Sequence, residues 1–272
     1  MMSVFGVTMV KDEEDIIGSV VAHMLSQVDH VIVADNLSTD RTREILDGLS
    51  CPQLTVVDDL DPAYYQSKKV TALAHHAGEM GAKYIIPFDA DEIWYSPFGT
   101  VRDVLSGLPS EWLVISADLY DHVPTDIDDQ SVVDPVERIG WRRKEPGALP
   151  KVACQYQPDL VVEQGNHSVT YSHRPAILGG QLVVRHFPYR SREQMVRKAM
   201  NGASALESTT LGEESGAHWR GYSRIVKTDG EQALWAVFDE WFSVRHPYDR
   251  DDLIYDPAYA AVPGGGTESS NK

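Results

Sequence analysis

The sequence lacks the usual marks of a secreted or membrane-spanning protein. It has only two cysteines, Cys51 and Cys154, which is too few for a disulfide framework. No apolar run approaches the roughly 18 residues that a membrane-spanning helix requires, and no basic segment followed by an apolar core opens the chain. These absences favour a cytoplasmic protein with reduced thiols and no transmembrane segment.

Positive charge is also scarce. The 272 residues include 24 lysines and arginines against 41 aspartates and glutamates, so the formal net charge is −17. Such a surface repels phosphate backbones and anionic lipid, which disfavours nucleic acid as a partner. A local basic pocket for a nucleotide diphosphate is still compatible with this balance. The hydrophobic content of 42% is typical of a globular protein.

Several ligand-binding motifs are missing. The patterns G-x-G-x-x-G and G-x-x-x-x-G-K-[ST] do not occur, which excludes a dinucleotide fingerprint and a P-loop. The closely spaced H-x-H and H-E-x-x-H motifs are absent too, although metal-dependent hydrolases commonly use such spacing. A nucleotidyltransferase would need a basic, glycine-rich loop after the first strand, but residues 11–15 (KDEED) are acidic. Both activities stay open as alternatives, together with a binding module that has no catalysis.

The N-terminal third of the chain alternates strand and helix patterns. Strands are predicted at 3–10, 30–34, 54–57 and 84–88, with amphipathic helices between them at 11–24, 41–49 and 66–80. A β-α-β-α-β-α-β order calls for a parallel sheet with helices on its faces. The sequence therefore predicts an α/β fold.

Acidic residues follow the last of these strands. Asp89 and Asp91 are two residues apart, so in an extended chain their side chains point to the same side. Two hard oxygen ligands suit Mg²⁺ or Mn²⁺, either of which can hold a diphosphate. Asp35 ends another parallel strand, and we expect it at the same sheet edge, where open α/β sheets bind ligands. The alternative is an acidic turn that binds nothing.

The rest of the chain is less regular. We expect a helix at 101–108, a strand at 112–117, an unpatterned acidic loop at 118–135 and short strands between 151 and 186. A compact basic cluster stands at 142–144 (RRK), and a solvated loop is the alternative there. Capping-box spacing at 191–194 predicts a helix to about residue 201. A polar loop should follow at 202–221, and the aromatic residues of a helix at 229–242 should dock against the sheet. These patterns predict a main domain at 1–202, a helical extension at 203–262 packed on it, and a disordered tail at 263–272.

Four segments in this order resemble the glycosyltransferase family 2-like enzymes of GT-A fold. They are 10–17 (VKDEEDII), 35–42 (DNLSTDRT), 88–92 (FDADE) and 186–191 (HFPYRS), with Lys198 and Gly202 downstream. One departure is Asp12, which stands where the family's first motif usually has asparagine. The resemblance implies a Rossmann-like, mostly parallel central sheet flanked by helices, with a donor half at about 1–118 and an acceptor half at about 119–202.

The same resemblance implies an activity. A hexosyltransferase-type enzyme would take a sugar from a nucleotide-diphosphate donor, a UDP- or GDP-sugar. It would pass the sugar to an acceptor saccharide or another hydroxyl-bearing molecule, with inversion at the anomeric carbon by direct displacement. The leaving nucleoside diphosphate gathers negative charge, so a divalent metal, Mn²⁺ or Mg²⁺, or protein cations must neutralise it.

Roles for individual residues follow from the resemblance. The implied donor-binding residues are Val10, Asp12, Asp35, Lys69 and Asp89, and the implied metal ligands are Asp89, Asp91 and His186. Asp35 would accept a hydrogen bond from the base or ribose, and Lys69 or its neighbour Lys68 would neutralise a phosphate. For His186, a structural role at the end of a strand is the alternative.

The acceptor side is the least defined part of the predicted site. Direct displacement needs a carboxylate or imidazole to take the proton of the acceptor hydroxyl. Asp118, Asp121, Glu163 and His167 all lie on segments that could face the site. Glu163 and His167 flank a Gly-Asn turn beyond the sheet core, and of these two we slightly favour His167. The acidic loop and the basic cluster are expected to frame the acceptor groove.

Overall fold

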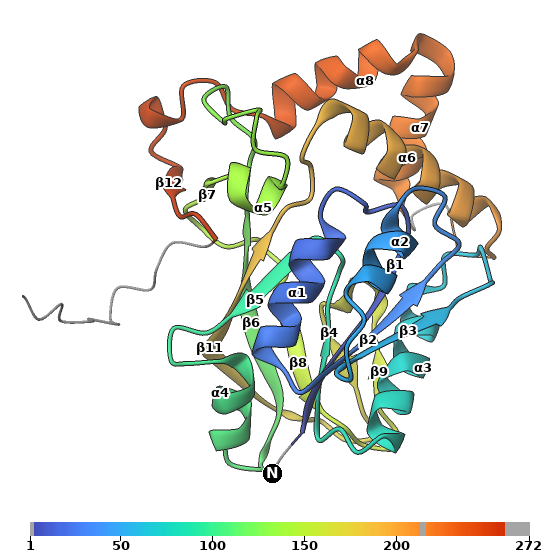
Figure 1. Cartoon of the computed structure of the whole chain (residues 1–272), viewed down its shortest axis with the longest axis vertical. Coiled ribbons are helices and arrows are strands. Elements are labelled where there is room, and N and C mark those ends of the chain that lie inside the picture. The colour runs from blue at the N-terminus through green and yellow to red at the C-terminus, as the bar shows by residue number, and fades with distance from the viewer. Residues whose placement is uncertain (1–2, 211, 213–215, 259–272) are drawn as a thin grey trace, which may run out of the picture.

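Helices pack on both faces of one large sheet in this protein (Figure 1). The structure, a computed structural model, describes residues 3–210, 212 and 216–258. The strands are β1 Val4–Val10, β2 His30–Asp35, β3 Leu54–Asp58, β4 Tyr84–Pro87, β5 Glu92–Tyr95, β6 Trp112–Asp121, β7 Trp141–Arg143, β8 Lys151–Gln155, β9 Val161–Val162, β10 Val169–Thr170, β11 Ala176–His186 and β12 Leu253–Tyr255. The helices are α1 Ile17–Gln27, α2 Thr42–Gly48, α3 Gln66–Glu79, α4 Val101–Gly107, α5 Pro135–Arg138, α6 Arg192–Glu207, α7 Ala217–Asp229 and α8 Glu231–Val237. The described α/β architecture confirms the predicted fold class.

The N-terminal half forms the predicted parallel unit. Strands β3, β2, β1 and β4 are neighbours in that order, and each adjacent pair is parallel. Val10 at the end of β1 is in register with Asp35 at the end of β2. Because parallel strands end at one edge, the loops that follow β1, β2 and β4 meet there.

Two hydrophobic clusters fix the helices on the sheet. On one face, α1 buries Ile17, Val20 and Met24 in the cluster that also holds Trp94 and the residues of α4. On the other face, α3 buries an apolar stripe against β1, β2 and β8. Burial of each fully enclosed aliphatic side chain stabilises the fold by about 1.5–3 kcal/mol. Both faces being covered explains why these strands are almost continuously apolar.

The second half of the sheet adds antiparallel strands to the mostly parallel arrangement that was expected. The sheet is mixed: β8 lies antiparallel between β4 and β6, and β5 is antiparallel to β11 at the edge. Strands β6 and β11 pair in parallel with a bulge between Leu178 and Leu182. The antiparallel β8 could not be inferred from helix–strand alternation, because no helix precedes it to set its direction.

Two expectations about loops were wrong. Strand β6 continues through Asp121, into the segment expected to be loop. The segment expected as a polar loop at 202–221 contains the end of α6 and the start of α7. In the basic cluster, Arg142 and Arg143 lie in β7, which pairs with β12, so the alternative of a solvated loop does not hold for them. For β6 and β7, pairing with a distant segment supplies order that the local composition does not indicate.

The C-terminal aromatic residues pack on helices and not on the sheet. Phe238 and Leu234 are buried against α6, and Trp235 and Phe242 pack at the margin of the same cluster. Trp241 is 66% exposed. The expected disordered tail at 263–272 lies outside the described residues. Within residues 3–210, 212 and 216–258, no helix has both the length and the apolar character to cross a bilayer.

Candidate active site

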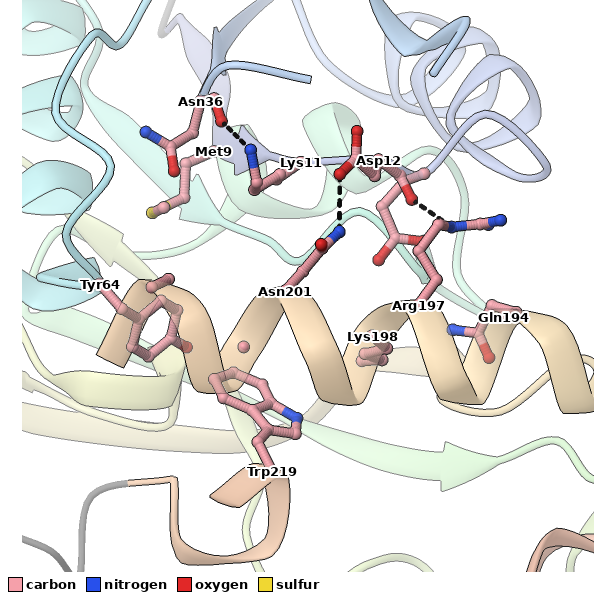
Figure 2. A pocket seen from close by; sticks show the side chains of 13 residues that line it. Met9, Lys11, Asp12, Asn36, Tyr64, Gln194, Arg197, Lys198, Asn201 and Trp219 are labelled. Carbon is pink, nitrogen blue, oxygen red and sulfur yellow. Dashed lines mark hydrogen bonds between the residues drawn. The ribbon is translucent and has the colours of Figure 1, made fainter. Parts of the chain in front are cut away.

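A two-part cleft lies at the carboxyl edge of the parallel strands, beneath α6 and α7. The first part lies between the loops after β1 and β2 and helices α6 and α7 (Figure 2). The second part holds Asp89, Asp91, Asp121 and His186. Residues that line both parts are Met9, Glu13, Tyr64, Lys198 and Trp219. The two parts therefore share walls and can take one elongated ligand.

Asp91 is a buried carboxylate of the cleft that contacts two cationic side chains. It sits in the turn between β4 and β5, and only 4% of the residue is exposed. Lys198 Nζ lies 2.7 Å from its Oδ2, and Arg190 Nη1 lies 3.8 Å from the same oxygen. Burial alone would raise the pKa of Asp91, but Lys198, His186 and Arg190 together hold it well below its usual range. Asp91 is therefore ionised at neutral pH.

His186 ends β11 beside Asp91. Its Nε2 lies 3.6 Å from Asp91 Oδ1, and its Nδ1 is hydrogen-bonded to Asp121 Oδ1 at 2.7 Å. Burial lowers the pKa of His186, but the two carboxylates outweigh that effect and raise it. The parallel pairing of β6 with β11 sets this contact, since His186 and Asp121 are in register at the strand ends.

Asp89 lines the same part of the cleft with different partners. Its Oδ1 accepts hydrogen bonds from Gln66 at 3.0 Å and Asn166 at 2.9 Å, and Lys151 Nζ lies 2.5 Å from its Oδ2. Lys151 also pairs with the buried Glu92 at 2.8 Å. Residue 91 belongs to a turn, so Asp89 and Asp91 reach one cleft through a bend and not through the extended backbone that was expected.

The first motif shapes the first part of the cleft. Asp12 has a φ of 54°, is buried, and accepts hydrogen bonds from the Thr39 amide at 2.5 Å and from Asn201 Nδ2 at 2.6 Å. Aspartate tolerates this left-handed conformation better than most residues. It joins the loop after β1 to the loop after β2 and to α6. Asp12 is thus held by protein groups on both oxygens.

The other predicted donor residues have mixed placements. Val10 is a buried residue at the end of β1. Asp35 Oδ1 accepts from the Ser38 amide at 3.3 Å, and neither part of the cleft is lined by Asp35, whereas the next residue, Asn36, lines the first part. Lys69 pairs with Asp59 at 2.6 Å and also lines neither part.

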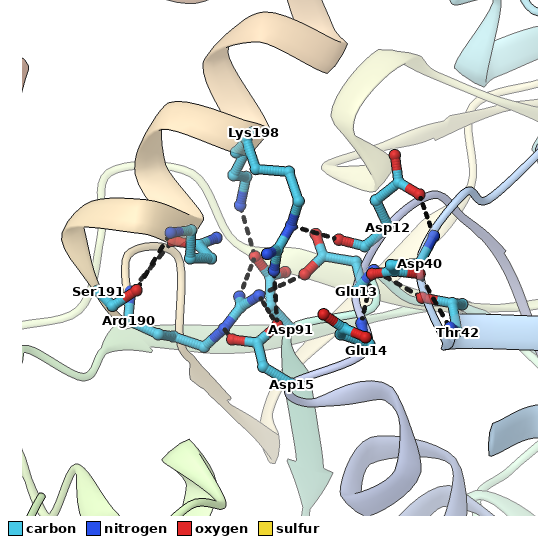
Figure 3. Close-up of polar contacts among 12 residues, drawn as sticks. Asp12, Glu13, Glu14, Asp15, Asp40, Thr42, Asp91, Arg190, Ser191 and Lys198 are labelled. Carbon is cyan, nitrogen blue, oxygen red and sulfur yellow. Dashed lines mark hydrogen bonds and ion pairs between the residues drawn. The ribbon is translucent and has the colours of Figure 1, made fainter. Parts of the chain in front are cut away.

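Arg190 pairs with acidic side chains from two segments in the interior (Figure 3). Its side chain is 0% exposed. It donates to Asp15 through Nε at 2.8 Å and through Nη2 at 2.9 Å, and it also pairs with Glu13. Arg190 Nη1 donates to the Phe187 carbonyl at 3.0 Å. Burial raises the pKa of Glu13 despite these cations. The arginine thus ties the loop after β1 to the corner between β11 and α6, next to Asp91.

The two candidates for the general base lie beside the cleft and not on its lining. His167 is half-buried, and its Nδ1 lies 2.9 Å from the Pro150 carbonyl oxygen, so this nitrogen donates and Nε2 is left as an acceptor. Burial, and next the nearby Lys151, lower the pKa of His167. Glu163 accepts from Thr170 Oγ1 at 3.0 Å. Asp121, a less favoured candidate for the general base, does line the cleft.

Several cleft residues were missed or given no role from sequence. From sequence, Lys198 is evident only as part of a motif, and no pattern marks Tyr64 or Trp219. Tyr64 falls in a connecting loop and Trp219 in a segment expected to be loop. The one signal that was present is the spacing of Lys198 and Gly202, which places both on one face of α6 at i and i+4.

The basic cluster expected beside the acceptor groove is largely paired. Arg142 Nε lies 2.6 Å from Asp256, and Arg143 Nη1 lies 2.5 Å from Asp252. These acids come from the C-terminal segment that pairs with β7. A hollow lined by Arg143 also includes Asp121, so it adjoins the cleft through that residue.

The comparisons with known proteins concern both the sequence and the fold. Residues 7–104 match the family model of Glycosyl transferase family 2. The match confirms the resemblance over the segments that contain Asp12, Asp35 and Asp91, and it supports transferase activity. The parallel strands and the helices of this segment agree with the α/β fold that the resemblance implies (Figure 1). No match to this sequence was found among the curated proteins.

Solved structures that match this chain include three at low sequence identity. A mannosyltransferase from Pyrobaculum calidifontis in complex with GDP-Man and Mn²⁺ is 15% identical, with a TM-score of 0.41, over 89% of this chain and 76% of that chain. Glucosyl-3-phosphoglycerate synthase from Mycobacterium tuberculosis, in complex with Mn²⁺, uridine-diphosphate and phosphoglyceric acid, is 13% identical, with a TM-score of 0.37, over 78% and 80%. A 4-diphosphocytidyl-2C-methyl-D-erythritol synthase is also 13% identical, with a TM-score of 0.38, over 66% and 90%.

Proposed function

We propose that the protein is a hexosyltransferase-type glycosyltransferase that moves a sugar from a nucleotide-diphosphate sugar to an acceptor hydroxyl. Inversion at the anomeric carbon by direct displacement is part of this proposal. One observation carries it: the family match and the cleft coincide. Asp12, Glu13 and Asp91 lie within residues 7–104 and line the cleft, where His186 and Lys198 join them from outside the match.

A divalent metal, Mn²⁺ or Mg²⁺, belongs to the proposal. The described residues contain no group of three or more His, Cys, Asp and Glu side chains arranged for a metal. Two ligands are nevertheless well matched, because Asp91 and His186 face one another and Asp121 holds His186 Nδ1, leaving Nε2 to ligate. Magnesium sites often use one or two protein ligands together with substrate phosphates. The bound metal would neutralise the leaving diphosphate.

The remaining donor contacts follow from the charges along the cleft. We assign Lys198 to the diphosphate, because its Nζ stands between the two parts of the cleft and beside Asp91. Lys69, which is paired with Asp59, stays a weaker candidate for the same role. Asp89 is kept as a residue for the donor ribose and the metal, and Val10, Asp12 and Asp35 as the residues that shape the nucleotide side.

The acceptor would enter from the side of residues 119–202, opposite the donor half at 1–118. His167 is supported as the general base by its lowered pKa and by its free Nε2, since a base must be unprotonated. Glu163 is the alternative. Asp121 becomes a third candidate, because it lines the cleft. We also retain a cytoplasmic location, which the free thiols of Cys51 and Cys154 favour.

A panel assay tests the function directly. The purified protein is incubated with UDP- and GDP-hexoses and Mn²⁺ or Mg²⁺, with and without saccharide acceptors, and released nucleoside diphosphate is measured. Acceptor-stimulated release of the diphosphate supports a transferase. Release of a nucleoside monophosphate together with a sugar 1-phosphate would indicate a hydrolase instead. In a parallel reaction with a nucleoside triphosphate and a sugar 1-phosphate, release of pyrophosphate would indicate a nucleotidyltransferase. Binding without turnover across the panel would leave a binding module.

A further inference from the structure

Trp219 stands opposite the loops that follow β1 and β2. It lies on α7 and lines both parts of the cleft, with Met9 and Asn36 on the opposite wall (Figure 2). Its indole meets the ring of Tyr64 edge-on, with centroids 5.0 Å apart and an interplanar angle of 79°. Two aromatic rings therefore form one side of the pocket, and only Tyr64 belongs to the segment that matches the family.

The backbone around Trp219 is built to admit its ring. Gly202 on α6 faces the indole, and a Cβ at that position would come within 2.4 Å of it. Gly216, which precedes α7, has a φ of 63°, and a Cβ there would meet Leu206 at 2.4 Å. Any other residue at 202 would push the indole away from α6. This close approach explains why residue 202, downstream of the segment 186–191, is a glycine.

The chemistry of the cleft changes along its length. Gly202 and Ala205 of α6 lie beside Trp219 and Tyr64, whereas the cationic Arg197 and Lys198 lie further along the helix. Lys198 then reaches Asp91 in the second part. A nucleoside diphosphate has the same polarity, with a flat aromatic base at one end and negative phosphates at the other.

We propose that Trp219 stacks on the nucleobase of the donor, so that the helical extension completes the donor pocket. This inference rests on the proposed function and deepens it, because it names the ligand group that contacts a residue outside the family match. Base–aromatic stacking contributes about 1–3 kcal/mol per base. Every base has a π-face, so stacking on Trp219 strengthens binding of uridine and guanosine diphosphates alike.

Binding measurements on the full chain test this role. Calorimetric titrations with UDP, GDP and inorganic pyrophosphate are made on the unaltered protein and on Trp219→Ala, Trp219→Phe and Gly202→Ala. We expect Trp219→Ala to weaken UDP and GDP about tenfold or more, Trp219→Phe to weaken them less, and neither to change pyrophosphate affinity. Gly202→Ala should also weaken both nucleotides, because it displaces the indole without removing it. Trp241→Ala, at an exposed position, is the matched control and should bind as the unaltered protein does.

The outcomes separate the inference from the proposed function. Equal loss of pyrophosphate and nucleotide affinity in Trp219→Ala, at an unchanged circular dichroism spectrum, would mean that the residue only supports α6 and would overturn the inference. Unchanged UDP and GDP affinity with weakened nucleotide-sugar affinity would place the indole on the sugar, which also overturns it. Either result can occur in a protein that transfers sugar normally. Failure of all nucleotides to bind the unaltered protein would contradict both proposals together.

Discussion

Lys198 Nζ lies 2.7 Å from Asp91 Oδ2, and this contact joins α6 to the turn after β4. The lysine is on the element that closes the cleft, and the aspartate is on the sheet edge. A diphosphate that enters the cleft would compete with Asp91 for the same ammonium group. On the proposed function, the pair would link the position of α6 to occupancy of the cleft, and Asp91 supports the packing of α6 as well as lining the cleft.

Asp91→Asn should abolish transfer and metal-dependent nucleotide binding. The amide keeps the shape of the side chain but loses the charge that a divalent metal requires. Transfer is measured with the nucleotide sugar identified by the panel assay, and nucleotide binding is titrated with and without Mn²⁺. Full transfer activity in this variant would sink the assignment of Asp91 as a ligand.

Asp91→Ala should also destabilise the fold, contrary to what a strand-end acid suggests from sequence. Removing the carboxylate leaves Lys198 and the buried Arg190 without one of their acids, and breaking buried pairs costs about 3–5 kcal/mol. Asp58→Ala, an exposed acid at the end of β3, is the control and should leave the urea midpoint nearly unchanged. Equal midpoints for both variants would show that the buried pairs contribute nothing net.

The metal proposal predicts a graded response at His186. His186→Ala should weaken Mn²⁺ binding more than it weakens nucleotide binding measured without metal. Asp121→Asn should have a smaller effect in the same direction, about 10–100-fold on metal affinity, because it disturbs the orientation of the ring and not the ligand itself. Isothermal titration with Mn²⁺ measures both. If nucleotide binding without metal falls as much as Mn²⁺ binding, the histidine contacts the nucleotide instead.

The sequence was sufficient for the parallel half of the fold and for the edge where the site lies. Alternating patterns determine strands and helices locally, and the parallel order of the β-α-β units then places Asp35 and Asp89 at one sheet edge. The sequence was insufficient where a segment becomes a strand only by pairing with a distant segment, as β8 and β7 do. Trp219 and Arg190 belong to this second class, because a cleft wall and a buried arginine are defined by packing partners far away in the chain.

Arg190→Met should lower the free energy of unfolding by about 3–5 kcal/mol, since it leaves Glu13 and Asp15 without their main cation in a buried place. Arg190→Lys should recover only part of this loss, because an ammonium group cannot reproduce the two-pronged contact with Asp15. Arg192→Met removes a neighbouring arginine whose pair with Asp239 is exposed, and it should change stability little. Urea unfolding monitored by circular dichroism compares the three. A midpoint for Arg190→Met near that of Arg192→Met would contradict the role of the arginine.

The buried His122 should make the free energy of unfolding sensitive to acid. The ring is buried and stacks on Phe187 with centroids 4.4 Å apart, and burial lowers its pKa to about 3. In the unfolded chain its pKa is about 6.5, so below that pH the unfolded state binds a proton that the folded state excludes. Stability should fall as pH drops from about 6.5, by at most about 1.4 kcal/mol per pH unit for this group.

His122→Phe removes the titrating group from both states. The variant should show a shallower loss of stability between pH 6.5 and pH 4, whatever its stability at neutral pH. His76→Phe, at an exposed position on α3, is the matched control and should keep the slope of the unaltered protein. Unfolding midpoints in urea across this pH range give the slopes, and parallel curves for His122→Phe and the unaltered protein would contradict the assignment.

The identity of the general base is decided by kinetics on three variants. A base acts on the acceptor hydroxyl, so its loss should lower kcat by about 10²–10⁴-fold while leaving donor affinity unchanged. For His167→Ala we expect the largest loss, because its lowered pKa keeps the ring unprotonated and its Nε2 is free to accept. Glu163→Gln should have a smaller effect, since its carboxylate is already held by Thr170. Asp121→Asn separates two roles. If excess Mn²⁺ restores the transfer rate of this variant, Asp121 acts by orienting His186. If the transfer rate stays low at saturating Mn²⁺, Asp121 acts in proton transfer. If Asp121→Asn transfers sugar slowly even at saturating Mn²⁺ and His167→Ala transfers it normally, the base is the Asp121 carboxylate and not the His167 imidazole.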